Sequence, residues 1–459
     1  MLVGVTCGLS APYVAGQLDY VLANGTDVAG TLLGFNPLSL ARDKAIEKDA
    51  RGRSFRDIAS AFAHAGTGAG MGGETVAGSA AAATTFIVNP VVGPEPVAGS
   101  SRMKGGSATA VLLDAICMRS LGLVPGLIPS DHSMSRHCTQ TVTDTFAAYQ
   151  AVHARTYASV DATLPGLMET AGKSLRAGGR VLYMGQGPSA GAIGFIDASE
   201  MPDTYGSPFD QIRGFVDCGW AGLGNAEGDI AHTSPLLRLG LDHFVADVLP
   251  TLGTTDTVIF LFCPDSTDHS CRSFGVAAPV EAAMAAVTTT GATVHAVAAV
   301  HTDTLRAASA LLTTLPGGSG SCSGHGPDMG SRVLLGLPGD ICTAGTCDYA
   351  LKLITNAITT YAQAVGRGAL FRGLMVATGP ANDKVHVLWN LPARHLLPLL
   401  TLITHCHTTS VLLQYSYHSL PMPRRDPIDL PKVCESNRHH RPRHTTQRRA
   451  VSVESHLPR

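Results

Sequence analysis

The residues best suited to binding chemistry lie in one segment, residues 89–109, with the sequence NPVVGPEPVAGSSRMKGGSAT. Adjacent hydroxyls at Ser100 and Ser101 stand next to two cations, Arg102 and Lys104. Small residues let backbone N–H groups approach a ligand closely, and a cation beside a helix start favours negative charge. This 89–109 segment therefore predicts a site for a phosphate or another compact anion. A ligand-free loop between a strand and a helix is the alternative interpretation, because such loops often have this composition.

The elements around the 89–109 segment predict how it is positioned. A β-rich run at residues 84–88 precedes it, and apolar periodicity predicts a helix from about Ser107 to Ser120. The chain opens on a second strand, at residues 2–5, whose following loop carries Thr6 and Ser10. Alternating strands and helices imply a parallel sheet that binds ligands at the carboxyl ends of its strands. We expect both hydroxyls and the segment at such ends.

A second set of strands predicts a second α/β unit. Five strands are expected, at residues 180–184, around Val216, and at 257–262, 293–300 and 333–337, with a tight loop at 185–191 and a closing helix at 349–365. The expected division of the chain is a first domain over 1–125 with a Gly/Ala-rich insertion at 64–83, a helical connection over 126–157, a second domain over 158–390, and a basic, disordered tail over 391–459.

Composition excludes several classes of function. The formal net charge of the 459 residues is −2, which gives no reason to expect nucleic acid or an anionic membrane as a partner. No apolar run has membrane-spanning length with suitable flanks, so we expect a soluble protein of the cytoplasm or the nucleus. Eleven cysteines show no metal or disulfide pattern, and the closest pair, Cys342 and Cys347, is expected to stay reduced. We expect neither a metal nor a cofactor.

Three stretches carry a resemblance to a known family. They are GPEPVAGSSRMKGGSAT at 93–109, GVTCGLSAPYVAGQLDY at 4–20 and LLGFNPLSLARDKAIE at 32–47. Together they resemble the branch of the SIS (sugar isomerase) family that contains glucokinase regulatory proteins and N-acetylmuramic acid 6-phosphate etherases. The Gly-Gly-Ser-Ala-Thr ending at 105–109 is similar to the regulators, whereas the etherases usually read Ala-Gly-Thr-Ala. The resemblance extends over residues 1 to 390, with gaps.

This resemblance implies a fold. It implies tandem SIS domains, each a parallel sheet flanked by helices. The stretch at 4–20 corresponds to the middle of the family's first domain, so we expect that domain to be truncated at its N-terminus. The missing strands would leave apolar edges and faces of the first sheet exposed.

The resemblance also implies site residues. Thr6, Ser10 and Ser101 match hydroxyl positions that contact phosphosugar in the regulators, and Ser100 and Lys104 lie beside them in the 89–109 segment. A phosphosugar needs hydroxyl donors and a nearby cation around its phosphate. A further candidate, Lys384 in Asn-Asp-Lys, resembles the lysine that the family's C-terminal cap lends to the ligand. For any one hydroxyl alone, a loop or capping role is the simpler interpretation.

No catalytic constellation is visible. The family's etherases use a pair of carboxylates, which the resemblance places upstream of Met1, and we expect Glu95 to order its own loop instead. The leading hypothesis is a non-catalytic regulator that resembles glucokinase regulatory protein. It would bind fructose 6-phosphate or fructose 1-phosphate and modulate a glucokinase or hexokinase. The alternative is an etherase-type lyase that acts on a carbohydrate derivative.

Overall fold

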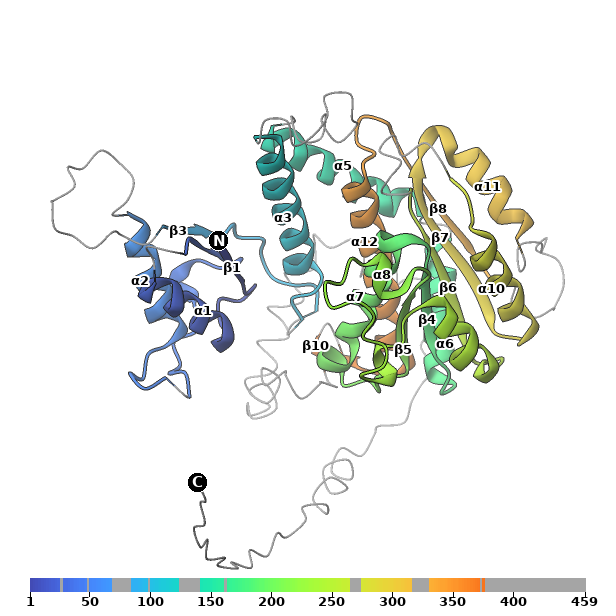
Figure 1. Cartoon of the computed structure of the whole chain (residues 1–459), viewed down its shortest axis with the longest axis horizontal. Helices are drawn as coiled ribbons and strands as arrows, with labels where there is room; N and C mark the ends of the chain where they lie inside the picture. The colour runs from blue at the N-terminus through green and yellow to red at the C-terminus, as the bar shows by residue number, and fades with distance from the viewer. Residues whose placement is uncertain are drawn as a thin grey trace, which may run out of the picture. The chain divides into compact units, whose positions relative to one another are not determined.

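The computed structural model describes residues 1–375 apart from 25–27, 48, 68–83, 98–99, 124–140, 161–162, 265–273, 316–329 and 372–373. Lys384 and the basic tail expected over 391–459 lie outside the described residues, as does most of the Gly/Ala-rich insertion. Two parallel sheets and their flanking helices make up the described part of the chain (Figure 1). The expected α/β class is confirmed.

The larger sheet has five parallel strands in the order β5-β4-β6-β7-β8. Their bounds are β4 Val181–Gly185, β5 Ile212–Val216, β6 Thr257–Phe262, β7 Thr293–His301 and β8 Arg332–Leu337. Every residue of β4 and β6 is buried. Near-continuous apolar strands are typical of a parallel sheet that is covered on both faces.

Helices cover both faces of this larger sheet. They are α6 Leu164–Arg176, α7 Gly187–Tyr205, α10 Ala278–Thr289, α11 Leu305–Thr314 and α12 Ala344–Gly366. Tyr183 of β4 belongs to a core with α6, α7 and α12, whereas Leu182 and Met184 belong to a second core with α10 and α11. Since successive strand residues point to opposite faces, the two cores lie on opposite sides of the sheet.

The smaller sheet has three parallel strands in the order β1-β2-β3. They are β1 Leu2–Val5, β2 Gly30–Leu33 and β3 Thr85–Val88, with α1 Pro12–Ala23 and α2 Phe55–Thr67 packed against them. The core under these helices contains Leu18, Val21 and Phe62, all fully buried. On the other face, Val3 and Phe86 occupy one row of the register and are 37% and 54% exposed.

Two helices lie between the sheets in the sequence, α3 Lys104–Gly122 and α5 Val142–Val160. Both contact α12, and they contact one another. The remaining described elements are short: 38–40, 219–222, 235–237, 241–243, 244–248, 249–251 and 302–304 are helical turns, and β9 Leu370–Phe371 pairs with β10 Leu374–Met375. No helix among the described residues has both the length and the apolar character needed to cross a membrane.

Several expected boundaries were wrong. α3 begins at Lys104 rather than Ser107, and α7 begins at Gly187, inside the stretch expected as a loop. α12 begins at Ala344 rather than Tyr349, because Thr343 and Thr346 form a reciprocal capping box at its start. Residues 64–67 of the expected insertion form the last turn of α2.

Candidate functional site

The N-terminus of α3 is capped by a carboxylate from the 89–109 segment. Glu95 Oε2 accepts a hydrogen bond from Lys104 N and Oε1 accepts one from Gly105 N, both at 2.8 Å. A carboxylate at this position also complements the partial positive charge of the helix start. The interpretation of Glu95 as the residue that orders its own loop therefore agrees with the geometry.

The chain itself satisfies the first-turn donors of α3. Besides the two N–H groups held by Glu95, Gly106 N donates to Ser101 O at 2.8 Å, and Ser107 N donates to Met103 O at 3.1 Å. The donors that a helix start leaves for a ligand are thus already paired. An anion at this place has to be held by side-chain hydroxyls and ammonium groups, with the helix contributing only its dipole.

The loop after β1 meets the start of α3. A Cβ placed on Gly105 would lie 2.9 Å from Cys7 Sγ and 3.2 Å from Glu95 Oε1, so a larger residue here would displace the Cys7 side chain. The Cys7 thiol also makes hydrogen bonds with the side chains of Ser101 and Thr109, and burial raises the pKa of this thiol. Cys7, which the sequence analysis did not single out, is the residue through which the two loops touch.

Thr6 and Ser10 sit in the turn after β1. Thr6 is buried, and its Oγ1 accepts hydrogen bonds from Ser10 N at 3.2 Å and Ala11 N at 3.3 Å. Between them, Leu9 is fully buried with a φ of 51°, a conformation that only a tight turn imposes on leucine. The Thr6 hydroxyl therefore shapes the turn that presents the half-buried Ser10.

Two serine hydroxyls of the 89–109 segment are buried without a partner. Ser100 is 5% exposed and Ser107 is 8% exposed, and neither Oγ has a hydrogen-bond partner among the described residues. Ser101 between them is exposed. Because buried hydroxyls are nearly always paired, these two are candidates for hydrogen bonds to a ligand.

Two ammonium groups lie close to the same helix start. Lys104 Nζ is 3.9 Å from where a Cβ of Gly93 would be, over the turn that Gly93 makes with a φ of 77°. Lys352 comes from α12, donates to Arg102 O at 3.2 Å, and has its Nζ 3.5 Å from a would-be Cβ of Gly106. Burial lowers the pKa of Lys352, and the carboxylate of Glu200 opposes that shift.

The other cation of the segment, Arg102, is not available to a ligand. Its side chain is 3% exposed and pairs with Asp197 and, through Nε at 2.9 Å, with Glu200, both on α7. Burial opposes its charge, but the Asp197 and Glu200 carboxylates raise the pKa of Arg102 above its ordinary value. Of the two cations in the segment, Lys104 is therefore the one left for an anion, and Arg102 serves the structure.

Arg102 also bonds to α12. Its guanidinium donates to Asn356 Oδ1 and Thr360 Oγ1 at 3.0 Å and to Thr359 Oγ1 at 3.2 Å. One side chain therefore joins the 89–109 segment to two helices of the larger sheet. We call Arg102, Asp197 and Glu200, with the α12 residues Asn356, Thr359 and Thr360, the Arg102 network.

A cavity of about 170 Å³ lies beside Lys352. α3 contributes Asp114 to its wall, and α5 contributes Tyr149, whose phenol donates to Asp114 Oδ2 at 2.7 Å. The ring of Tyr149 packs edge-to-face against Tyr349 of α12, with 5.1 Å between the ring centroids. Polar and aromatic groups thus line a hollow next to the proposed anion site.

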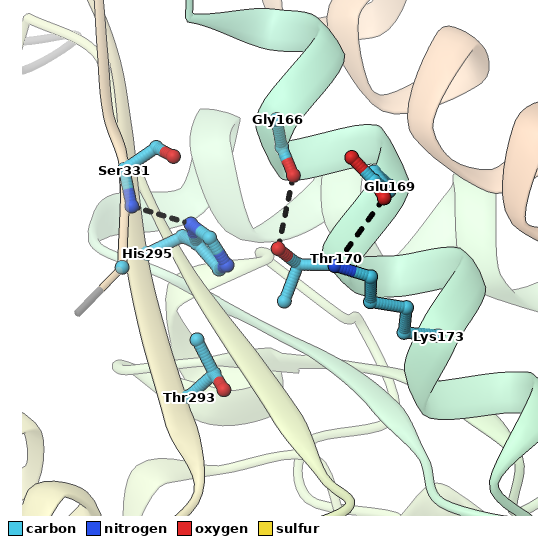
Figure 2. A pocket seen from close by; sticks show the side chains of 8 residues that line it. Gly166, Glu169, Thr170, Lys173, Thr293, His295 and Ser331 are labelled. Atoms are coloured by element: carbon cyan, nitrogen blue, oxygen red, sulfur yellow. Dashed lines mark hydrogen bonds and ion pairs between the residues drawn. The ribbon is translucent and has the colours of Figure 1, made fainter. Parts of the chain in front are cut away.

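Figure 2 shows a second hollow, of about 150 Å³, lined by Thr170, Thr293, His295 and Ser331. Ser331 N donates to His295 Nδ1 at 2.8 Å, and the histidine is buried. The hollow lies where β7 and β8 begin. Since parallel sheets bind ligands at the carboxyl ends of their strands, this is not the candidate site. Within the described residues no group of three or more His, Cys, Asp or Glu side chains could hold a metal ion.

Comparison with known proteins bears on the family. Residues 158–308 match the family model "Glucokinase regulatory protein, second SIS domain". The glucokinase regulatory protein of Xenopus laevis is 36% identical over 265 residues, which cover 58% of this chain and 39% of that protein. The chain is similar to glucokinase regulatory proteins, and its residues 158–308 are similar to their second SIS domain. The resemblance expected from the sequence is confirmed.

Other relatives fit the same branch. The human glucokinase regulatory protein is 32% identical over 265 residues, 58% of this chain and 38% of that protein. An N-acetylmuramic acid 6-phosphate etherase of Symbiobacterium thermophilum is 28% identical over 211 residues, 46% of this chain and 58% of the etherase. The chain thus spans less than two fifths of the length of these two regulators and a larger share of the etherase.

Among solved structures, the C-terminal domain of glucosamine-fructose-6-phosphate aminotransferase from Francisella tularensis aligns with a TM-score of 0.42 at 8% identity. The alignment covers 83% of this chain and 72% of that one. A likeness of this strength assigns no function.

Proposed function

We propose that this protein is a non-catalytic phosphosugar-binding regulator, which binds fructose 6-phosphate or fructose 1-phosphate and modulates a glucokinase or hexokinase. The observation that carries the binding part is the pair of buried hydroxyls, Ser100 and Ser107, without partners among the described residues. The regulatory part is supported by the similarity to glucokinase regulatory proteins. A sugar phosphate supplies the acceptors that the hydroxyls need.

In this proposal the phosphate lies beside the start of α3. Glu95 already holds the first N–H groups of the helix, so the hydroxyls of Ser100, Ser101 and Ser107 donate to the phosphate oxygens instead. The ammonium groups of Lys104 and Lys352 balance its charge. Ser10, presented by the turn that Thr6 shapes, and Lys384, which lies outside the described residues, complete the proposed set.

The position of Glu95 favours a regulator over a lyase. Both of its carboxylate oxygens accept backbone hydrogen bonds at the helix start, so the group acts as a cap and not as a poised acid or base. The Arg102 network supplies a route for regulation, because it connects the ligand-binding segment to α7 and α12. A ligand that prefers one arrangement of this connection shifts the population of arrangements that a kinase meets.

Isothermal titration of the full chain with fructose 6-phosphate and fructose 1-phosphate tests the binding. We expect saturable heat with one of them, and Ser101→Ala should weaken it by about 1–3 kcal/mol, roughly 5- to 150-fold, because a charged acceptor loses a donor. Ser120→Ala is the matched control, since its hydroxyl bonds to Ile116 O at the other end of α3. Absence of heat with both sugars at millimolar concentration would refute the proposal.

The regulatory part needs a separate measurement. The initial rate of a glucokinase is followed while the chain is added, with and without each fructose phosphate. We expect the rate to change with the chain and the change to depend on the sugar phosphate. Sugar binding without any effect on the kinase rate would support phosphosugar binding and refute the regulatory part of the proposal.

A further inference from the structure

We propose that Cys342 and Cys347 form a reversible disulfide at the start of α12. Their Sγ atoms lie 3.7 Å apart, and both residues are buried. A disulfide bond measures about 2.0 Å, so the sulfurs need to approach by about 1.7 Å. This approach has to come from rotation of the two side chains and adjustment of the turn between them.

Backbone hydrogen bonds hold the two thiols in register. Before the helix, Cys342 N donates to Pro338 O at 2.8 Å in the turn that follows β8. Within the helix, Cys347 N donates to Thr343 O at 3.0 Å. The capping box of Thr343 and Thr346 fixes the residues between the cysteines, so the contact between the thiols belongs to an ordered turn.

The alternative interpretation is that the two cysteines only fill space, because buried cysteine often acts as a small apolar side chain in protein cores. The pair here differs in two respects. The sulfurs touch each other rather than only aliphatic groups, and the exposure is graded, with Cys342 at 8% and Cys347 at 0%. This difference in exposure sets the sequence in which the thiols react. Cys342 reacts first with a reagent from solvent, and Cys347 is the resolving thiol.

The oxidant that we name is a small disulfide such as oxidised glutathione. The Cys342 thiolate attacks one sulfur of glutathione disulfide, forms a mixed disulfide and releases one glutathione thiolate. The Cys347 thiolate then attacks Cys342 Sγ, forms the protein disulfide and releases the second glutathione. The two cysteines lose two protons and two electrons, and the glutathione disulfide takes up both electrons and becomes two thiols.

The bond would tie the start of α12 to the turn after β8. The same helix carries Lys352 toward the start of α3 and carries Asn356 and Thr359 into the Arg102 network. The closed loop holds six residues and is partly accessible. Because Cys342 retains some exposure and Cys347 has none, glutathione attacks this bond at Cys342, and the bond should form and break with the thiol–disulfide balance of the surroundings. This inference stands apart from the proposed function, because it uses only the two thiols and their turn.

Tryptic mapping tests the disulfide in the full chain. Trypsin releases residues 333–352 as one peptide, VLLGLPGDICTAGTCDYALK, whose only cysteines are these two. The native chain is equilibrated with glutathione disulfide, quenched in acid, alkylated and digested. We expect this peptide to lack both alkyl groups and to lose the mass of two hydrogens, and reduced glutathione in excess should restore both thiols.

Single variants give the order of attack. Cys347→Ser should leave Cys342 with a stable glutathione adduct, whereas Cys342→Ser should leave Cys347 unmodified, since it is fully buried. Cys117, exposed and alone in the tryptic peptide 105–119, reports ordinary surface modification in every sample. The proposal fails if the unsubstituted chain keeps two alkylatable thiols in peptide 333–352, or carries only glutathione adducts there, while Cys117 reacts.

Discussion

Both sheets are parallel, but they differ in how many of their strand residues are buried. In the larger sheet, β4 and β6 are buried at every position and separate two apolar cores. In the smaller sheet, α1 and α2 cover one face, and the row of Val3 and Phe86 on the other face is partly exposed. The central strand β2 is the only strand of the smaller sheet, as described, that is buried at all positions. We infer that the larger sheet carries most of the stability.

The proposed ligand site depends on both sheets. The turn after β1 brings Cys7 against Ser101, and α12 brings Lys352 to the first turn of α3. The Arg102 network then fixes the 89–109 segment on α7 and α12. Binding of a phosphosugar at this place would therefore depend on contacts from the partly exposed smaller sheet and from the covered larger sheet.

The largest effect is expected at the point that joins the two regions. Arg102→Ala removes a buried cation and leaves Asp197 and Glu200 without their partner, which should cost about 3–5 kcal/mol of unfolding free energy. Equilibrium denaturation in urea measures it. Arg238→Ala is the control, because its ion pair with Asp247 is exposed and should contribute at most about 1 kcal/mol. Equal losses in the two variants would show that the Arg102 network does not connect the regions.

Matched core cavities test whether the sheets unfold separately. Phe62→Ala on α2, which packs against the smaller sheet, and Phe260→Ala in β6 of the larger sheet each remove a fully buried ring and should cost about 3–5 kcal/mol locally. Hydrogen exchange resolved by residue follows each sheet. Phe62→Ala should speed the exchange of β2 amides more than about 100-fold and leave β6 unchanged. Equal acceleration of both strands would mean that the sheets unfold as one unit.

The sequence predicted best the elements that local pattern decides. TVIFLF at β6 was predicted with its observed bounds, because a continuous apolar run between polar turns is compatible with only a buried strand here. The start of α3 was missed, because the Glu95 carboxylate, nine residues before Lys104, extends the helix by a bond that periodicity does not show. The start of α12 was missed because its capping box uses threonine at both positions.

The site was predicted only in outline. The loops of Thr6 and Ser101 do come together, but composition cannot tell which of two neighbouring cations is buried. The partner of Arg102, Asp197, is 95 residues away in the sequence. Lys352 was missed as well, although a single lysine among the apolar residues of a long helix is a signal that could have found it. The ligand itself stays a prediction.

A smaller effect is expected at an ion pair of the larger sheet. Burial opposes the charge of Asp256, but hydrogen bonds from Arg180 and Gly253 outweigh it and hold the pKa of Asp256 below its ordinary value. Its ionised form therefore stabilises the fold above the unfolded pKa, about 3.9, and this contribution is lost as the pH falls through the folded pKa. Asp256→Asn should cost about 1–3 kcal/mol at pH 7. Denaturation at several pH values should show that difference shrinking below about pH 4.

The smaller sheet has an acid-sensitive group of its own. Hydrogen bonds from Arg53 lower the pKa of Asp49 to about 2. The same sign applies, so its stabilisation is lost only as the pH falls from about 4 toward 2. Asp49 is near solvent, so Asp49→Asn should change stability at pH 7 less than Asp256→Asn does. A larger loss of stability for Asp49→Asn than for Asp256→Asn would contradict the inference that the larger sheet carries most of the stability.

The smallest effect is expected on the open face of the smaller sheet. Phe86 is 54% exposed in β3, so Phe86→Thr, which keeps β-propensity, should change the unfolding free energy by no more than about 0.5 kcal/mol. Denaturation at two protein concentrations, with Phe62→Ala as the buried reference, measures this. A loss as large as that of Phe62→Ala would show that the ring is covered in solution. If that loss also grew with protein concentration, a second copy of this chain would cover the ring. Both sheets would then be covered on both faces, the larger by its own helices and the smaller in part by another molecule.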